Sequence, residues 1–149
     1  MRVEQLAEAI ARLDAKDALP GVLTLQDWKA LAPYLSVRFL RPGDPLMHEG
    51  DCERELFILA DGELRVSIGG NAIATLLPGT VVGEGTFFSG QPRSATVTPA
   101  TGGVAWGLHW DRFEALSKKN PALAVNLVKG LAAVLAVRMR EALLVGHFA

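Results

Sequence analysis

Turn dipeptides recur at intervals of roughly ten residues between positions 37 and 108, and this spacing limits the fold more than any other feature of the sequence. The dipeptides are Pro42-Gly43, Gly50-Asp51, Asp61-Gly62, Gly69-Gly70, Pro78-Gly79 and Gly102-Gly103. Each apolar run between them is long enough for one short strand. Such a pattern is typical of a small antiparallel sandwich or jelly roll, because the strands of a parallel sheet alternate with helices.

The apolar runs themselves predict where the strands lie. They occupy positions 37–40, 45–48, 56–59, 63–68, 72–76, 95–98 and 104–108. This middle zone therefore predicts seven or eight short strands. Asp61-Gly62 is the strongest signal for a hairpin, because both residues of a two-residue turn must accept positive φ.

Both ends of the chain carry helical patterns. The first stripe of apolar residues, at three- and four-residue spacing, is Val3, Leu6, Ile10 and Leu13. A second helix follows, in which Thr24 and Asp27 have the spacing of a capping box. We expect residues 1–35 to form an N-terminal helical segment and residues 36–149 to form the β domain with its C-terminal helices.

The C-terminal part predicts a short helix capped by Asp111 and a long helix that begins at Asn120-Pro121. The long helix should run to Val145, where Gly146 provides a stop. Its apolar residues cover more than one narrow stripe. One interpretation is a single core-facing stripe with scattered alanines elsewhere. The interpretation we favour is that a second stripe packs on a partner's copy of the helix, which predicts a homodimer through residues 127–145.

Composition excludes several classes of protein. Half of the 149 residues are hydrophobic and 21% are charged, which fits one packed domain and excludes wholesale disorder. Fifteen basic and sixteen acidic side chains give a net charge of −1, which is not typical of a nucleic-acid-binding protein. The sequence shows no signal peptide, and Asn126 and Lys129 interrupt its most apolar stretch, so we expect no membrane partner. With Cys52 as the single cysteine, these features fit a cytoplasmic protein.

Neither a metal site nor a catalytic arrangement is apparent. His48, His109 and His147 lie far apart in the sequence, and no serine–histidine or paired-carboxylate pattern suggests catalysis. Cys52 lies between two acidic residues, a setting that does not favour a thiolate. We therefore expect neither a metal, nor a cofactor, nor an enzyme.

One segment, residues 83–97, interrupts the strand pattern. Gly83 and Gly85 allow a close backbone approach, Arg93 offers a planar fork for a phosphate or carboxylate, and Ser94 adds a hydroxyl. Glu84 beside such an anion site would suit a ligand that also carries a sugar hydroxyl. The alternative is a glycine-rich surface loop with solvated charges. These residues alone leave both interpretations open.

This segment resembles the phosphate-binding cassette of cyclic nucleotide-binding domains, the module of protein kinase A regulatory subunits, cyclic-nucleotide-gated channels and the bacterial catabolite activators. Gly83-Glu84 and Pro92-Arg93-Ser94-Ala95-Thr96 match the family pattern with its spacing. The resemblance extends to Arg41-Pro42-Gly43-Asp44, Glu49-Gly50-Asp51, Leu56-Phe57-Ile58-Leu59 and Asp61-Gly62-Glu63-Leu64-Arg65-Val66. It covers most of the chain and implies an eight-stranded, jelly-roll-like β-roll with flanking helices.

The resemblance also implies a role for each residue of the cassette. Arg93 would pair with the exocyclic oxygens of the cyclic phosphate. Ser94 and Ala95 would offer backbone N–H groups, and Ser94 its hydroxyl as well. Glu84 would accept a hydrogen bond from the ribose 2′-OH, with the backbone of Gly83 nearby. Neither Arg93 nor Glu84 is expected in the core.

One feature departs from the family pattern, and for a second feature, the long helix, the sequence does not fix the alignment with the family. Gly85-Thr86-Phe87 stands where the family has Leu-Ala-Leu, so Gly85 is expected to remove an apolar anchor and loosen the cassette. Alignment of the long helix with that of the catabolite activators places Arg138 where that family contacts the base. Arg138 would stack on the purine or bond its edge. The alternative, to which we give equal weight, is that Arg138 is an exposed arginine near the end of the helix.

The resemblance implies a regulatory sensor that binds cyclic AMP, or next cyclic GMP, and transmits occupancy through its C-terminal helix. Alternatives are a ligand-free interaction module of the same fold and a cyclic di-GMP effector. The catabolite activators carry a DNA-binding winged helix after the long helix, whereas only residues 146–149 follow here, so we expect no DNA binding. A protein partner or a fused output domain would receive the signal.

Overall fold

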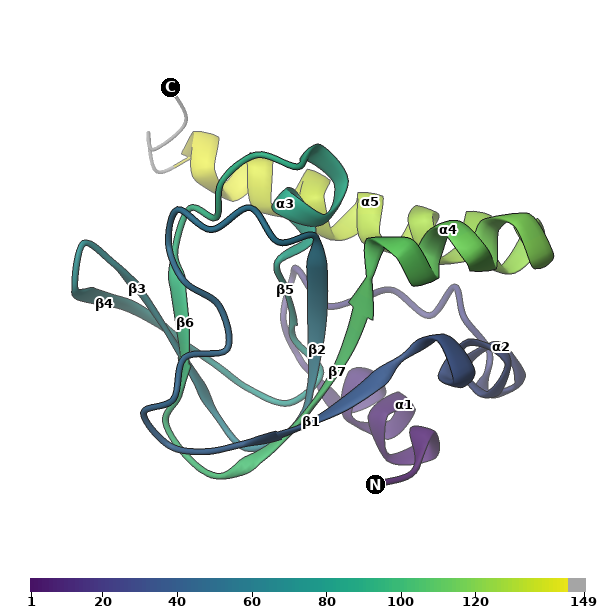
Figure 1. Cartoon of the computed structure of the whole chain (residues 1–149), viewed down its shortest axis with the longest axis horizontal. Helices are drawn as coiled ribbons and strands as arrows, with labels where there is room; N and C mark the ends of the chain where they lie inside the picture. Colours follow the sequence, from purple (N-terminus) through teal and green to yellow (C-terminus); the bar gives the residue numbers. More distant parts are fainter. Residues whose placement is uncertain (145–149) are drawn as a thin grey trace.

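Two antiparallel sheets form the centre of the molecule (Figure 1). The computed structural model describes residues 1–144, so the helix end predicted at Val145 and Gly146 lies outside the described residues. The first sheet has the order β1 (Ser36–Leu40), β7 (Gly103–His109), β2 (Glu55–Asp61) and β5 (Val81–Val82). The second sheet has the order β4 (Asn71–Leu76), β3 (Leu64–Ile68) and β6 (Thr96–Pro99).

The predicted architecture, a β-roll with flanking helices, is confirmed, but the strand count is not eight. Residues 1–144 contain seven strands. Positions 45–48 do not form the predicted strand, because Met47 makes only an isolated bridge to Val97. The two-residue strand β5 was not predicted, since so short a run after Pro78-Gly79 has no detectable alternation.

The predicted hairpin at Asp61-Gly62 is wrong, because β2 and β3 belong to different sheets. Gly62 has a φ of 93°, and a Cβ there would lie 2.7 Å from the carbonyl oxygen of Gly102. The chain therefore uses this glycine to turn a corner from one sheet to the other. The hairpin that pairs β3 with β4 lies at Gly69-Gly70, where φ is positive at both residues.

Helices cover the outer face of the first sheet and both ends of its strands. They are α1 (Val3–Arg12), α2 (Leu25–Leu31), the 3₁₀ helix η1 (Ala32–Tyr34), α3 (Glu84–Ser89), α4 (Trp110–Lys119) and α5 (Pro121–Leu144). In Figure 1, α4 and α5 lie side by side at one end of the first sheet, and α1 lies near the other end. Leu6 of α1 and Leu127 of α5 join one hydrophobic core with Ile58 of β2. The N-terminal helices and α5 thus pack on the same sheet.

The predicted helix starts agree with the structure in two cases out of three. Thr24 and Asp27 form the capping box, with the Asp27 amide donating to Thr24 Oγ1 over 3.1 Å. Asn120 Oδ1 accepts a hydrogen bond from the amide of Leu123 over 3.2 Å. Asp111 is not the cap of α4. The helix begins at Trp110, two residues earlier than a cap at Asp111 predicts, and His109 is its N-cap, with Nδ1 accepting from the Asp111 amide.

Candidate ligand-binding site

A pocket of about 410 Å³ opens between α3, the start of β6, the β3–β4 hairpin and α5. All seven residues predicted for the site line it: Gly83, Glu84, Gly85, Arg93, Ser94, Ala95 and Arg138. Its size falls within the range of small-molecule pockets, roughly 300–1,000 Å³. The fold therefore brings together residues from the cassette and from the last helix.

Gly83 shapes the inner end of the pocket. It precedes α3 as the N-cap residue and has a φ of 83°, which L side chains rarely adopt. A Cβ at this position would collide with Arg93 Nη1 and would lie 3.0 Å from the carbonyl oxygen of Glu55. Only glycine lets the guanidinium lie this close to the backbone at the start of α3.

Arg93 is buried, with an exposed fraction of 6%, contrary to the expectation that it lies outside the core. Its Nη1 donates to the carbonyl of Gly83 over 3.1 Å, and its Nη2 donates to the carbonyl of Glu55 over 2.6 Å. Its amide donates to Asp51, so the turn at Gly50-Asp51 also holds this segment. Burial lowers the pKa of Arg93, and surrounding carboxylates such as Asp51 oppose that shift. An arginine remains charged, and both of these side-chain partners are neutral.

The residues that follow Arg93 add further donors. The backbone amides of Ser94 and Ala95 make no hydrogen bond to the described part of the chain, and both residues line the pocket. A buried guanidinium beside two unpaired amides provides a site for an anion. This geometry is the one expected for a phosphate.

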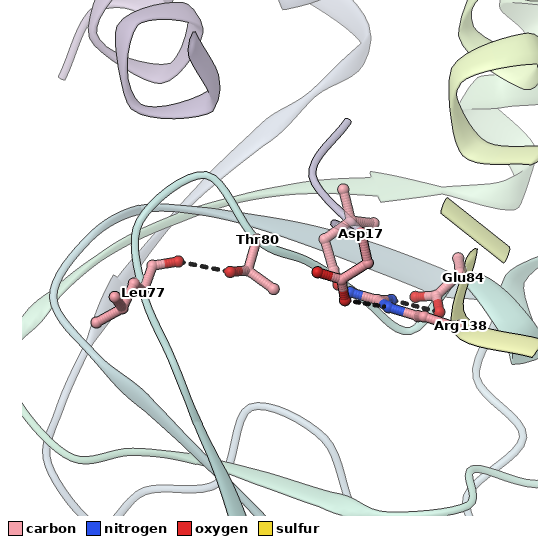
Figure 2. Close-up of polar contacts among 6 residues, drawn as sticks. Asp17, Leu77, Thr80, Glu84 and Arg138 are labelled. Carbon is pink, nitrogen blue, oxygen red and sulfur yellow. Dashed lines mark hydrogen bonds and ion pairs between the residues drawn. The ribbon is translucent and has the colours of Figure 1, made fainter. Parts of the chain in front are cut away.

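Glu84, the first residue of α3, is also buried, with an exposed fraction of 8%, which again corrects the expectation that it lies outside the core. Its Oε1 accepts a hydrogen bond from Arg138 Nη1 over 2.5 Å, as Figure 2 shows. Its Oε2 is buried and has no donor among residues 1–144. A buried carboxylate oxygen without a donor is costly, and a ligand hydroxyl would satisfy it.

Arg138 joins three segments of the chain at the rim of the pocket (Figure 2). Besides Glu84, its guanidinium donates from Nε to Asp17 Oδ2 over 2.9 Å and from Nη2 to the carbonyl of Val81 over 2.7 Å. Burial disfavours the charged form of Arg138, but Glu84 and Asp17 more than offset it and raise its pKa. Thr80 donates to the carbonyl of Leu77 and steadies the turn before Val81.

These contacts exclude one of the two interpretations of Arg138 that the sequence left open. The alternative of a merely exposed arginine is wrong, because its side chain is only 26% exposed and is held by two carboxylates. Contact with a purine stays a prediction. Asp17 was missed by the sequence analysis, since a lone aspartate in the loop between α1 and α2 gives no signal of its own.

Gly85 does not leave a gap in the core. A Cβ built there meets no atom within 4 Å, so the position faces open space. Phe87, two residues further on, is fully buried and anchors α3. The predicted loosening of the cassette therefore has no counterpart in the packing of this helix.

An apolar wall faces the charged residues across the pocket. It consists of Val66 and Ile68 from β3, Ile73 and Leu76 from β4, and Val82 from β5. Ile68 and Ile73 are 43% and 58% exposed and both line the pocket, so they leave apolar surface that a ligand could cover. These residues were not among those predicted for the site. The sequence signal that could have indicated this wall is the alternation of Val66 and Ile68 along one predicted strand.

The family model described as "Cyclic nucleotide-binding domain" matches residues 37–120, more than half of the chain. This chain belongs to the cyclic nucleotide-binding domain family. Such a domain is a regulatory binding module. The matched range contains Glu84 and Arg93 but neither Asp17 nor Arg138, which reach the pocket from the flanking segments.

Relatives of this cyclic nucleotide-binding domain come from different kinds of protein. The Cyclic AMP receptor protein of Thermus thermophilus is 32% identical over 114 residues, which is 73% of this chain and 51% of that protein. A cGMP-dependent protein kinase of Toxoplasma gondii is 39% identical over 77 residues, which is 52% of this chain and 8% of that protein. The match thus covers about half of the Thermus protein and 8% of the Toxoplasma kinase.

A crystal structure of a cyclic nucleotide-binding domain from Methylobacillus flagellatus supports the fold. It superposes with a TM-score of 0.79 at 22% identity, covering 93% of this chain and 79% of that one. The likeness includes the helices outside the matched range.

Proposed function

We propose that this domain is a non-enzymatic sensor that binds cyclic AMP, with cyclic GMP as its second ligand. The observation that carries the proposal is the joint placement of Arg93 and Glu84 in one pocket. Arg93 with the two free amides suits a cyclic phosphate, and the unpaired Oε2 of Glu84 suits a ribose 2′-OH. The apolar wall suits the flat face of a purine.

The similarities to relatives do not order the two nucleotides. The Thermus relative, named for cyclic AMP, is 32% identical over 73% of the chain, and a cGMP-dependent protein kinase of Plasmodium berghei is 29% identical over 78% of it. Cyclic AMP comes first in the proposal because the cassette and the long helix resemble those of the catabolite activators. Cyclic GMP is a direct competitor in every binding test.

The two alternative functions fit the pocket less well. A ligand-free interaction module gives no reason for an unpaired buried oxygen on Glu84 or for free amides beside Arg93. Cyclic di-GMP carries two phosphates, whereas the pocket offers one arginine with neutral partners, because Arg138 is already paired with two carboxylates. The arrangement suits a single cyclic phosphate better.

Calorimetry on nucleotide-stripped protein against cyclic AMP, cyclic GMP and cyclic di-GMP tests the proposal. We expect saturable binding of cyclic AMP, weaker binding of cyclic GMP, and a melting temperature that rises with cyclic AMP because the ligand binds only the folded state. No heat and no thermal shift with any nucleotide at millimolar concentration would favour the interaction module. Tightest binding of cyclic di-GMP would favour the effector.

We also propose that the domain forms a two-fold dimer through α5. One face of this helix buries Leu127, Leu131 and Val134 in the core. A neighbouring face of the helix carries exposed or half-buried apolar residues at alternating spacings of three and four: Val125, Val128, Ala132, Leu135, Met139 and Ala142. This is the repeat of a two-helix coiled-coil seam. The helix is also long and apolar enough to span a membrane by length and composition, but its buried face belongs to the core.

Light scattering checks the dimer. We expect a dimer at micromolar concentration and a monomer for Met139→Glu, which places a charge in the seam without touching the buried face. A wild-type monomer with and without ligand would contradict this assembly.

Occupancy would reach α5 through Arg138, since this residue bonds the same carboxylate that is proposed to receive the ribose hydroxyl. A ligand shifts the helix only if it binds one helix position better than the other. A change in the position of α5 would then alter the dimer contact or a tethered partner.

A further inference from the structure

Arg54, the residue before β2, holds the end of α3 that lies away from the pocket. Its Nε donates to the carbonyl of Phe87 over 2.9 Å, and its Nη2 donates to the carbonyl of Phe88 over 2.8 Å. The last carbonyls of a helix have no partner within the helix, so both bonds satisfy groups that would otherwise need water. The guanidinium therefore acts as a cap on the C-terminal end of the cassette helix.

The same residue is fixed to the first turn of α4. Its guanidinium carbon lies 3.9 Å from the ring centroid of Trp110, within the range of a cation–π contact. The backbone carbonyl of Arg54 also accepts a hydrogen bond from the amide of Trp110 over 2.8 Å. Arg54 thus bonds α3 with its side chain and α4 with both its side chain and its backbone.

Aromatic packing joins the two helices at the same place. The ring of Phe87 lies edge to face with those of Trp110 and Phe113, at centroid distances of 5.2 and 5.6 Å. Phe87 is fully buried. A guanidinium stacked beside this cluster excludes water from it and fixes the plane of the Trp110 ring.

The other end of α3 carries Glu84. The helix has six residues, and Glu84 lies about 6 Å along its axis from Phe88 at 1.5 Å per residue, so a tilt of about 15° at Phe88 displaces the start of the helix by roughly 1.5 Å. Hydrogen bonds within so short a helix do not fix its direction in the fold. The contacts at the two ends of α3 fix this direction.

We propose that Arg54 is a positioning residue for the nucleotide pocket, which locks α3 to α4 so that Glu84 keeps its orientation and a movement of α3 reaches α4. This inference rests on the proposed function of the same pocket. Arg54 does not line the pocket, so it acts through α3 and Trp110 and not by touching the ligand.

Two variants and a control separate this role from a general loss of charge. Arg54→Met keeps an unbranched apolar stem and removes the guanidinium, with all of its donors and its stacking. Arg54→Lys keeps the charge but cannot bond both carbonyls in one plane or stack flat on Trp110. Arg65→Met is the control, because Arg65 is exposed on β3 and its side chain makes no hydrogen bond or ion pair within residues 1–144.

The readouts are calorimetric affinity for cyclic AMP and the fluorine NMR signal of 5-fluorotryptophan at position 110, assigned with Trp110→Phe. In wild type and Arg65→Met, saturating cyclic AMP should shift the Trp110 signal. In Arg54→Met the affinity should fall roughly three- to tenfold, the scale typical of residues that act on a site without touching the ligand. At saturation the shift of the Trp110 signal should be lost. In Arg54→Lys, part of the affinity and part of the shift of the Trp110 signal should be restored.

The outcomes are distinguishable from those of the proposed function. Absence of cyclic nucleotide binding by the wild-type protein would overturn the proposed function and this inference with it. Normal wild-type binding, together with wild-type affinity and an unchanged Trp110 shift in Arg54→Met, would overturn only the role of Arg54. If Arg54→Met does not fold, Arg54→Lys decides alone, and wild-type values for both readouts in that variant would contradict the proposal.

Discussion

Two sides of the pocket are built in different ways. The inner wall, Gly83, Glu84, Arg93, Ser94 and Ala95, comes from one short stretch of sequence inside the family match. The outer wall, Asp17 and Arg138, joins residues 121 positions apart, and both lie outside that match. Among the described residues, the hydrogen bond and ion pair between Arg138 and Glu84 are the polar side-chain contacts that join the two walls.

The difference lies in what holds the charges. Arg93 bonds neutral backbone carbonyls, so its positive charge is left for a ligand. Arg138 is neutralised by Glu84 and Asp17, both with partly or fully buried side chains. Hydrogen bonds to backbone carbonyls hold the Arg93 guanidinium in a fixed position that salt does not screen. Partly exposed ion pairs, such as those of Arg138, can exchange partners. From this comparison we propose that the inner wall recognises the ligand and that the outer wall responds to it.

Removal of Arg93 should have the largest effect. A charge-assisted contact contributes about 1.5–3 kcal/mol, so Arg93→Ala should weaken cyclic AMP binding by at least roughly tenfold in calorimetry. Because Arg93 is buried and bonds Gly83 and Glu55, the variant should also lose about 1–3 kcal/mol of unfolding free energy. Arg65→Ala is the matched control. Unchanged affinity in a folded Arg93→Ala protein would place the phosphate elsewhere.

A methyl group on Gly83 should disturb the same wall without removing a charge. Gly83→Ala forces a side chain onto a residue with positive φ and against Arg93, so urea unfolding should show a loss of about 1–3 kcal/mol. Gly85→Ala, two residues away, meets open space and should leave stability unchanged or raise it by about 0.4–1 kcal/mol. Equal losses in both variants would show that the close approach at Gly83 is not required.

Glu84→Gln tests the junction of the two walls. The amide oxygen can still accept from a ribose hydroxyl, so the loss of affinity should be smaller than for Arg93→Ala. The ion pair with Arg138 becomes a neutral hydrogen bond. The 2′-deoxy analogue of cyclic AMP should bind the variant and the parent almost alike in calorimetry. A parent protein that does not distinguish cyclic AMP from its 2′-deoxy analogue would argue against the role of Glu84.

Asp17→Asn should have the smallest effect and should act on the outer wall alone. The Asp17–Arg138 pair is partly exposed, and such pairs contribute about 0–1 kcal/mol, so affinity for cyclic AMP should change by less than about fivefold. Lys16→Gln is a matched control, since Lys16 makes only an exposed ion pair with Glu141, at 3.8 Å. A loss in calorimetry as large as that of Arg93→Ala would mean that Asp17 contacts the ligand.

The sequence allowed prediction of the features that depend on local chemistry. The turn spacing indicated an antiparallel sandwich or jelly roll, Thr24 and Asp27 indicated a helix start, and the resemblance of the cassette motif indicated all of the inner wall. Apart from the cap predicted at Asp111, the wrong predictions of secondary structure concern pairing between distant segments. Nothing local distinguishes a glycine that closes a hairpin from Gly62, which turns the chain from one sheet to the other.

Burial was also beyond sequence reasoning. Arg93 and Glu84 are polar residues in a glycine-rich segment, which favours a surface position. Their burial depends on carbonyls of β2 and on α5, which only the folded chain brings near. Asp17 reaches the pocket for the same reason.

The central claim is that the cyclic phosphate sits on Arg93 and on the free amides of Ser94 and Ala95. Titration of cyclic AMP into ¹⁵N-labelled protein tests this directly, because an amide that donates to a phosphate oxygen shows a large downfield proton shift. We predict that the Ser94 and Ala95 amide signals move downfield and saturate with the calorimetric affinity. Saturable binding that leaves both signals in place while others shift would contradict the account.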